Sequence, residues 1–126
     1  MPSLVAVQKA IWARLDNQLA YGVYDDVPQG TTMPYVTLGN KTETDDLIFG
    51  AAGDEAFFDV HVWSDALGDL EALTIANLVR GALDGHTLTL AAGTQRLLKH
   101  DWTNTVRATT GTERQVVLRY KCQVDR

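Results

Sequence analysis

The segment Ala56–Leu83 changes once from the hydrophobic period of a strand to that of a helix, and this change constrains the fold most. In residues 56–63, alternation places three apolar side chains on one side: Phe58, Val60 and Val62. Such alternation in β-branched and aromatic residues predicts a strand, here a central one. Ser64 or Asp65 can then cap a helix whose apolar stripe is Ala72, Ile75, Ala76, Val79 and Leu83. Asp84-Gly85 ends it, and we expect this strand–helix unit to organise the core.

A second helix and four further strands are expected around this unit. Ser3 can cap a helix that ends near Gly22, and its apolar side is Leu4, Ile11, Trp12, Leu15 and Leu19. Residues 23–27 form a short extended piece that runs into a Pro/Gly loop. The segments interpreted as strands are 35–38, 86–90, 96–107 and 116–124.

Alternation in the last two strands predicts their core-facing side chains. These are Leu98, His100, Trp102 and Val106 in the first, and Val116, Leu118, Tyr120, Cys122 and Val124 in the second. Clean alternation on successive hairpins predicts an antiparallel sheet with one face toward water. The predicted class is therefore α+β: a mainly antiparallel sheet with two helices packed on one face, in the order α-β-β-α-β-β-β, as a single domain over residues 1–126.

Cysteine content and hydropathy indicate the cellular compartment of the protein. A single Cys122 excludes an internal disulfide framework and fits a reducing compartment. No apolar run reaches the ~18 residues of a membrane span, and the N-terminus lacks the regions of a signal peptide. We therefore expect synthesis in a cytoplasm and no membrane partner.

Charge is distributed unevenly along the chain. Residues 1–86 carry 13 acidic and 4 basic side chains, whereas residues 87–126 carry 3 acidic and 7 basic ones, for a net charge of −5. Proteins that grip DNA phosphates usually show a basic excess, so this balance argues against tight nucleic-acid binding. The two halves could form unlike patches that meet between copies, or simply two solvated faces.

No catalytic constellation is recognisable in the sequence, and no cofactor or metal is predicted. Cys122 falls on the apolar side of a strand, where a thiol is buried and inert. His61, His86 and His100 lack the close spacing of a zinc site and are interpreted as structural. The pairs Asp25-Asp26 and Asp45-Asp46 point to opposite sides in extended chain, although Asp45 with Glu43 could weakly hold a divalent ion.

The segment 40–55 is interpreted as a long polar loop that contacts a partner. Loops of this length are uncommon in compact domains and are usually functional or disordered. The predicted contact residues are Lys41, Glu43, Asp45, Asp46, Leu47, Ile48 and Phe49. The alternative is a hairpin whose apolar triplet 47–49 folds back onto its own core.

Four blocks, in order, resemble the tail-completion or tail-terminator proteins of long-tailed bacteriophages and related prophages. They are Val23-Tyr24-Asp25 with Val27-Pro28-Gln29-Gly30 and Pro34-Tyr35-Val36 with Leu38-Gly39; Val60-His61-Val62-Trp63-Ser64; Ala72, Ile75-Ala76, Val79-Arg80 and Leu83; and Leu118-Arg119-Tyr120. The chain departs from the family at Asp65, Asp69 and Glu71, where members often carry basic residues.

The resemblance implies a structural virion protein, made in a host bacterium, that acts without catalysis. Its implied partners are other copies of itself in a ring, usually of six, together with the tail tube protein and the head–neck connector. DNA would pass through the ring without sequence-specific binding. Two alternatives stay open: a neck or head-completion adaptor, and a small α+β enzyme or ligand-binding domain that uses the acidic loop.

The loop interpretation generates a first prediction. Replacing Leu47, Ile48 and Phe49 together by serine should leave folding normal, because the loop lies outside the expected core, and should abolish the joining of tails to heads. Thermal unfolding and electron microscopy of particles measure the two effects. Unfolding of the variant would instead place the triplet in the core.

Overall fold

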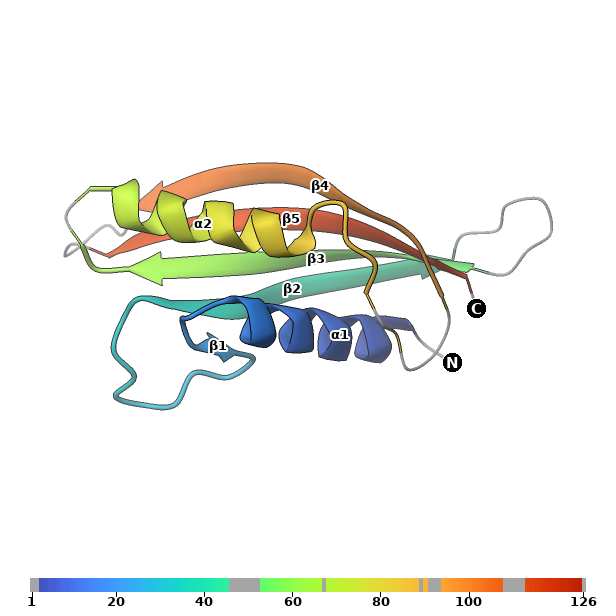
Figure 1. The fold of residues 1–126 in the computed structure, drawn as a ribbon, viewed down its shortest axis with the longest axis horizontal. Helices are drawn as coiled ribbons and strands as arrows, with labels where there is room; N and C mark the ends of the chain where they lie inside the picture. The colour runs from blue at the N-terminus through green and yellow to red at the C-terminus, as the bar shows by residue number, and fades with distance from the viewer. Residues whose placement is uncertain are drawn as a thin grey trace.

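Two helices lie on one face of a five-stranded sheet (Figure 1). The computed structural model describes residues 3–45, 53–66, 68–88, 90, 94–107 and 113–125. The elements are α1 (Ser3–Gln18), β1 (Val23–Tyr24), β2 (Tyr35–Asp45), β3 (Gly53–Ser64), α2 (Leu70–Leu83), β4 (Thr94–Arg107) and β5 (Arg114–Asp125). The predicted class and layering are confirmed. None of the helices described is long and apolar enough to cross a membrane.

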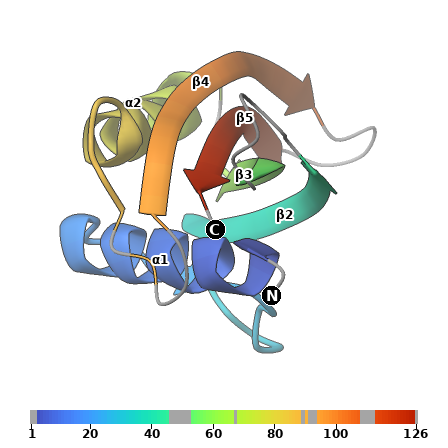
Figure 2. The same cartoon turned by 90° about the vertical axis from the view of Figure 1, so that its right-hand side faces the viewer.

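The sheet has the order β1-β2-β3-β5-β4, so β3 is its middle strand, as predicted. β3 pairs antiparallel with β5 from Gly53 opposite Asp125 to Ser64 opposite Arg114, without a register shift. β2 and β4 pair antiparallel on either side, and the two-residue β1 pairs parallel with β2. Figure 2, an end-on view, shows the strongly twisted sheet with both helices on one side.

The core lies between the helices and the inner face of the sheet. The inner residues of β3 and β5 are buried as predicted: Phe58, Val60, Val62, Val116, Leu118, Tyr120, Cys122 and Val124. The predicted stripe of α2 is also buried, from Ala72 to Leu83. The Phe58 and Tyr120 rings stack with centroids 5.6 Å apart, directly opposite each other across β3 and β5. The predicted core is therefore largely confirmed.

Helix α2 begins later than Ser64 or Asp65, with Asp69 at its N-cap position. The Ser64 hydroxyl accepts a hydrogen bond from the Ala66 N–H and donates one to Glu71. Ser64 therefore fixes the turn before the helix rather than the helix start. The predicted end is confirmed, because the Asp84 N–H bonds to the Arg80 carbonyl and Gly85 has a φ of 72°.

The predicted order of elements is wrong at two places, and the observed order is α-β-β-β-α-β-β. Residues 23–24 of the extended piece form the edge strand β1. Within 86–90, the described residues form no strand. The Gln95 side chain instead accepts a hydrogen bond from the Leu88 N–H and donates one to the His86 carbonyl. The Gln95 side chain thus makes the hydrogen bonds to the backbone of residues 86–88 that a neighbouring strand was expected to make.

A β-bulge in β4 changes which side chains of this strand point toward the core, so part of the prediction for β4 is wrong. His100 pairs with Tyr120, but Trp102 pairs with Arg119, so Asp101 is an extra residue in the ladder. The extra residue reverses the alternation after it. Leu98 is buried as expected, whereas Trp102 and Val106 are on the outer face of the sheet and about 40% exposed.

Trp12 on α1 was expected on the apolar side, and that expectation is wrong. Its side chain is 42% exposed, while Val7 is only 1% exposed. The Trp12 indole N–H donates to the Val23 carbonyl at 3.0 Å, so the ring lies over the edge strand β1 rather than in the core.

Tyr120 provides a test of the core. Its hydroxyl donates to Asp84 Oδ1 at 2.7 Å, and Asp84 also forms an ion pair with Arg80. Tyr120→Phe should lower the free energy of unfolding by about 1.5–3 kcal/mol, because one hydrogen bond to a charged group is lost. Urea unfolding measures this change. Tyr21→Phe is the control, since the Tyr21 hydroxyl bonds to no described residue; an equal loss in both variants would contradict the assignment.

Candidate assembly surface

Part of the predicted partner-contact loop is strand, because β2 continues to Asp45 and β3 begins at Gly53. Lys41, Glu43 and Asp45 are strand residues, paired with Phe58, Ala56 and Asp54. The loop interpretation of these three residues is therefore wrong. Their polarity suggested a loop, whereas the ladder uses only their backbone groups. The alternating threonines Thr42 and Thr44 were the signal for a strand.

The remaining predicted contact residues, Asp46, Leu47, Ile48 and Phe49, lie outside the described residues. Whether any of the seven contacts a partner stays a prediction.

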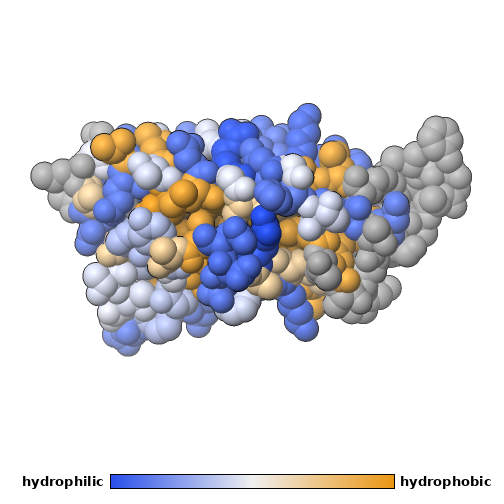
Figure 3. All heavy atoms as spheres, in the orientation of Figure 1, coloured by the Kyte–Doolittle hydropathy of each residue, from blue (hydrophilic) through white to orange (hydrophobic). Residues whose placement is uncertain are grey.

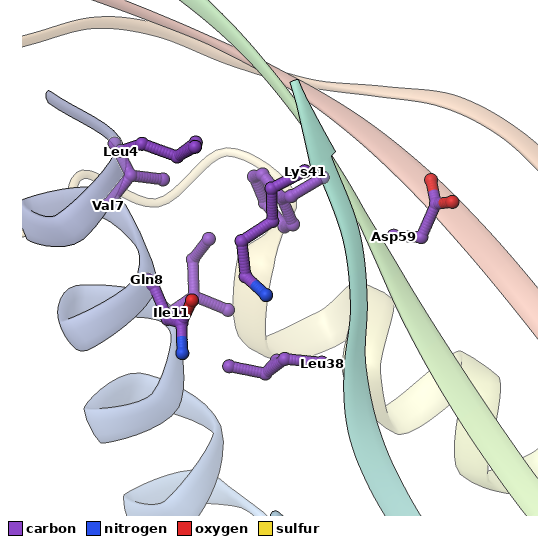
Figure 4. A pocket seen from close by; sticks show the side chains of 8 residues that line it. Leu4, Val7, Gln8, Ile11, Leu38, Lys41 and Asp59 are labelled. Atoms are coloured by element: carbon purple, nitrogen blue, oxygen red, sulfur yellow. The ribbon is translucent and has the colours of Figure 1, made fainter. Parts of the chain in front are cut away.

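Lys41 faces α1 and not the outer side of the sheet (Figure 4). A bulge between Leu38 and Lys41 aligns Lys41 with the inward-facing Phe58, and the Lys41 ammonium donates to the Gly39 carbonyl at 2.9 Å. The cavity beside it, between α1 and β2, has a volume of about 10 Å³. That is room for one water molecule at most, so this cavity is not a ligand site.

No described helix covers the outer face of the sheet. Long side chains of the strands themselves lie across it. Arg119 bonds to the nearly buried Asp59 at 2.9 Å. Its guanidinium also lies 5.8 Å from the Phe57 ring centre and 5.6 Å from that of Trp102. Such placement of a cation over aromatic rings is stabilising.

Lys121 and Glu55 form a second ion pair on this face, at 3.3 Å. Basic residues of β5 thus lie beside acidic residues of β3, because the two strands pair along their whole length. The expectation that the acidic and basic halves of the chain form separate patches is therefore wrong for this face.

Each histidine has a structural partner. His61 hydrogen-bonds Gln115 through its Nδ1 atom and stacks on Trp63, and its ring covers Gly39, where a Cβ would overlap it. His86 bonds to Arg14 at 3.0 Å and His100 to Thr103 at 2.6 Å. Within the described ranges no three His, Cys, Asp or Glu side chains group as metal ligands.

Cys122 is fully buried, and burial raises the pKa of its thiol to about 11. A thiol with so high a pKa is a poor nucleophile at neutral pH, which agrees with the inert role expected for it.

A hollow opens on the outer face at the end where β3 stops. It has a volume of about 140 Å³ and is lined by Trp63, Val106, Glu113, Arg114 and Gln115. We call it the sheet hollow. It is formed where β3 ends, β5 begins and the displaced Val106 of β4 lies opposite Gln115.

The large apolar side chains that remain exposed lie on three elements only, among the residues described. They are Val5 and Trp12 on α1; Leu70, Leu73 and Leu78 on α2; and Leu97, Trp102 and Val106 on β4. Figure 3 shows apolar surface over the first turns of α2. Exposed apolar side chains thus occur on both the helix layer and the sheet layer.

Ionisation of His61 provides a test of the outer face. Burial lowers the pKa of His61 below 6.5, and the Asp59 carboxylate opposes this shift more weakly. The unfolded chain therefore takes up this proton at a higher pH than the folded protein, and stability should fall as the pH drops through about 6.5.

Urea midpoints at about pH 7.5 and pH 5.5 measure this effect. His61→Gln should show a smaller fall than the wild type. A residual slope is expected from His100, whose pKa is also lowered by burial and secondarily by Arg80. Equal slopes in wild type and variant would contradict the assignment.

Comparison with known proteins identifies the family. No curated protein matches the chain. The structure is similar to a chain in the solved virion of a native gene transfer agent particle, with a TM-score of 0.90, 27% sequence identity and 98% of each chain covered. The family model described as tail completion protein gp17 matches residues 7–125. Because that match spans nearly the whole chain, the chain belongs to the tail completion protein gp17 family.

Proposed function

We propose that this protein closes the virion tail as a ring of identical copies and joins the tail tube to the head–neck connector. The observation that carries the proposal is the family match over residues 7–125. As a tail completion protein, the chain is a structural part of a phage-type virion. The likeness to a chain of a gene transfer agent virion over 98% of both lengths supports this role.

The surface chemistry supports a closed ring. A ring needs a heterologous interface, in which one patch meets a different patch on the next copy. Exposed apolar side chains on the helix layer and on the outer side of β4 supply two unlike patches. A ring of six copies follows the usual arrangement in the family.

DNA passage fits the charge of the chain. With 11 basic and 16 acidic side chains, the protein has no basic excess with which to hold phosphates. A lumen lined by such a protein lets DNA slide through.

Chemistry on a bound substrate is not part of the proposal. The cavity between α1 and β2 is the size of a water molecule, the thiol is buried, and the histidines have structural partners. We infer a protein that acts through shape and association.

Loss of the gene in its native particle system tests the function. We expect free heads and separate tails, with tails of irregular length, because the tube end is no longer closed. Electron microscopy of the lysate counts joined and unjoined particles, and supply of the wild-type protein from a plasmid should restore joining. Normal joined particles in the absence of the protein would exclude the proposed function.

A further inference from the structure

Two apolar features lie at the same end of the molecule and on opposite faces of the sheet. The first is the helix patch, formed by Leu70 and Leu73 at the start of α2; Leu70 is 79% exposed. The second is the sheet hollow beside Trp63 and Val106. Trp63 lies at the end of β3, and Leu70 begins α2 six residues after β3 ends, which places both features at the left end in Figure 1.

The two features match in size. A cavity of roughly 150 Å³ is known to accept benzene, a six-carbon group. The sheet hollow, at about 140 Å³, therefore has room for the four-carbon side chain of a leucine. Val106 and the Trp63 ring give it apolar walls beside the polar side chains of Glu113, Arg114 and Gln115, and Leu70 is the most exposed large apolar side chain described.

Charge also favours contact between unlike faces. The helices with their flanking segments, residues 3–34 and 65–88, carry seven acidic and three basic side chains. The ladder register places Lys99, Arg119 and Lys121 on the outer face of the sheet against Glu55 and Asp59. The helix layer is thus acidic and the outer face slightly basic, so a helix layer attracts an outer face more than another helix layer.

The placement of the two features limits which assemblies of copies a repeated contact between them can form. Both patches lie at the same level along the strands, so a repeated contact between them can rotate copies about an axis parallel to the strands with little translation. A heterologous contact of this kind builds a ring when the rotation that it imposes closes, and a filament when it does not.

We propose that Leu70 and Leu73 of one copy insert into the sheet hollow of the next copy, and that this contact closes the ring. The inference rests on the proposed ring function and assigns its interface to a second copy of this chain.

Cross-linking in assembled particles tests the contact. A variant carrying Leu70→Cys and Val106→Cys is supplied to particles that lack the native gene and is treated with a short bismaleimide. The only native cysteine, Cys122, is 0% exposed and stays unreactive. We expect a ladder of covalent oligomers that ends at the ring size. The matched control is Val5→Cys with Val106→Cys, because Val5 is 53% exposed but lies in the first turn of α1, at the opposite end of the molecule from both features (Figure 1), and it should give no ladder.

Charged variants test the same contact in solution. Leu70→Glu and Val106→Glu should each raise the concentration for half-maximal ring formation about tenfold or more, since one apolar contact per interface is lost. Mixed in equal amounts, the two variants should form dimers that do not grow, because each retains one intact face. Leu78→Glu, at a residue of the same helix that is 48% exposed but lies two turns beyond Leu70, should leave rings intact, and circular dichroism verifies folding.

The outcomes separate the interface from the function. Particles or rings that contain the cysteine variant and yield no ladder, or an equal ladder from the control pair, overturn the interface and leave the function standing. Rings that cross-link as expected, from a protein whose loss leaves tails normal, overturn the function and keep the interface. A protein that associates in neither setting overturns both.

Discussion

The unbroken pairing of β3 with β5 is the constraint on which the rest of this structure depends. Twelve residues of β3 face twelve of β5 in one register, from Gly53 opposite Asp125 to Ser64 opposite Arg114. On the inner side this register brings Phe58 onto Tyr120, and the two helices close over them. On the outer side the same register brings Asp59 to Arg119 and Glu55 to Lys121. A slip of one residue would exchange both sides at once.

That register explains why the outer face of the sheet is ordered and can also contact another molecule. Its acidic and basic side chains satisfy one another within the molecule, so none of the pairs described there requires a partner molecule. Apolar groups remain at the margins, on β4 and around the sheet hollow. Association through β4 then leaves these ion pairs in water, whereas contact at the sheet hollow also covers the charged side chains of Glu113 and Arg114, which costs desolvation.

The sequence predicted the middle of the molecule better than its edges. Alternation from Phe58 to Val62 and helical spacing from Ala72 to Leu83 were sufficient, because both elements are packed on the core and their patterns are undisturbed. The predictions for the edges of the sheet were wrong for local reasons. An extra residue at Asp101 moved Trp102 and Val106 outward, and Gln95 replaced a strand as the partner of residues 86–88. Neither a bulge nor a side-chain-to-backbone bond leaves a periodic signal in the sequence.

The candidate surface was less accessible to prediction than the fold. Polar residues 41–45 suggested a loop, although their backbone continues β2, and the hollow is lined by residues from three strand ends that lie apart in the sequence. The bulge at Asp101 has a consequence of its own. A single inserted residue on an edge strand exchanges which side chains face outward beyond it, while the buried layer on β3 and β5 is unaffected. Contact specificity in a protein built this way can diverge between lineages through insertions in β4, with no compensating change in the interior.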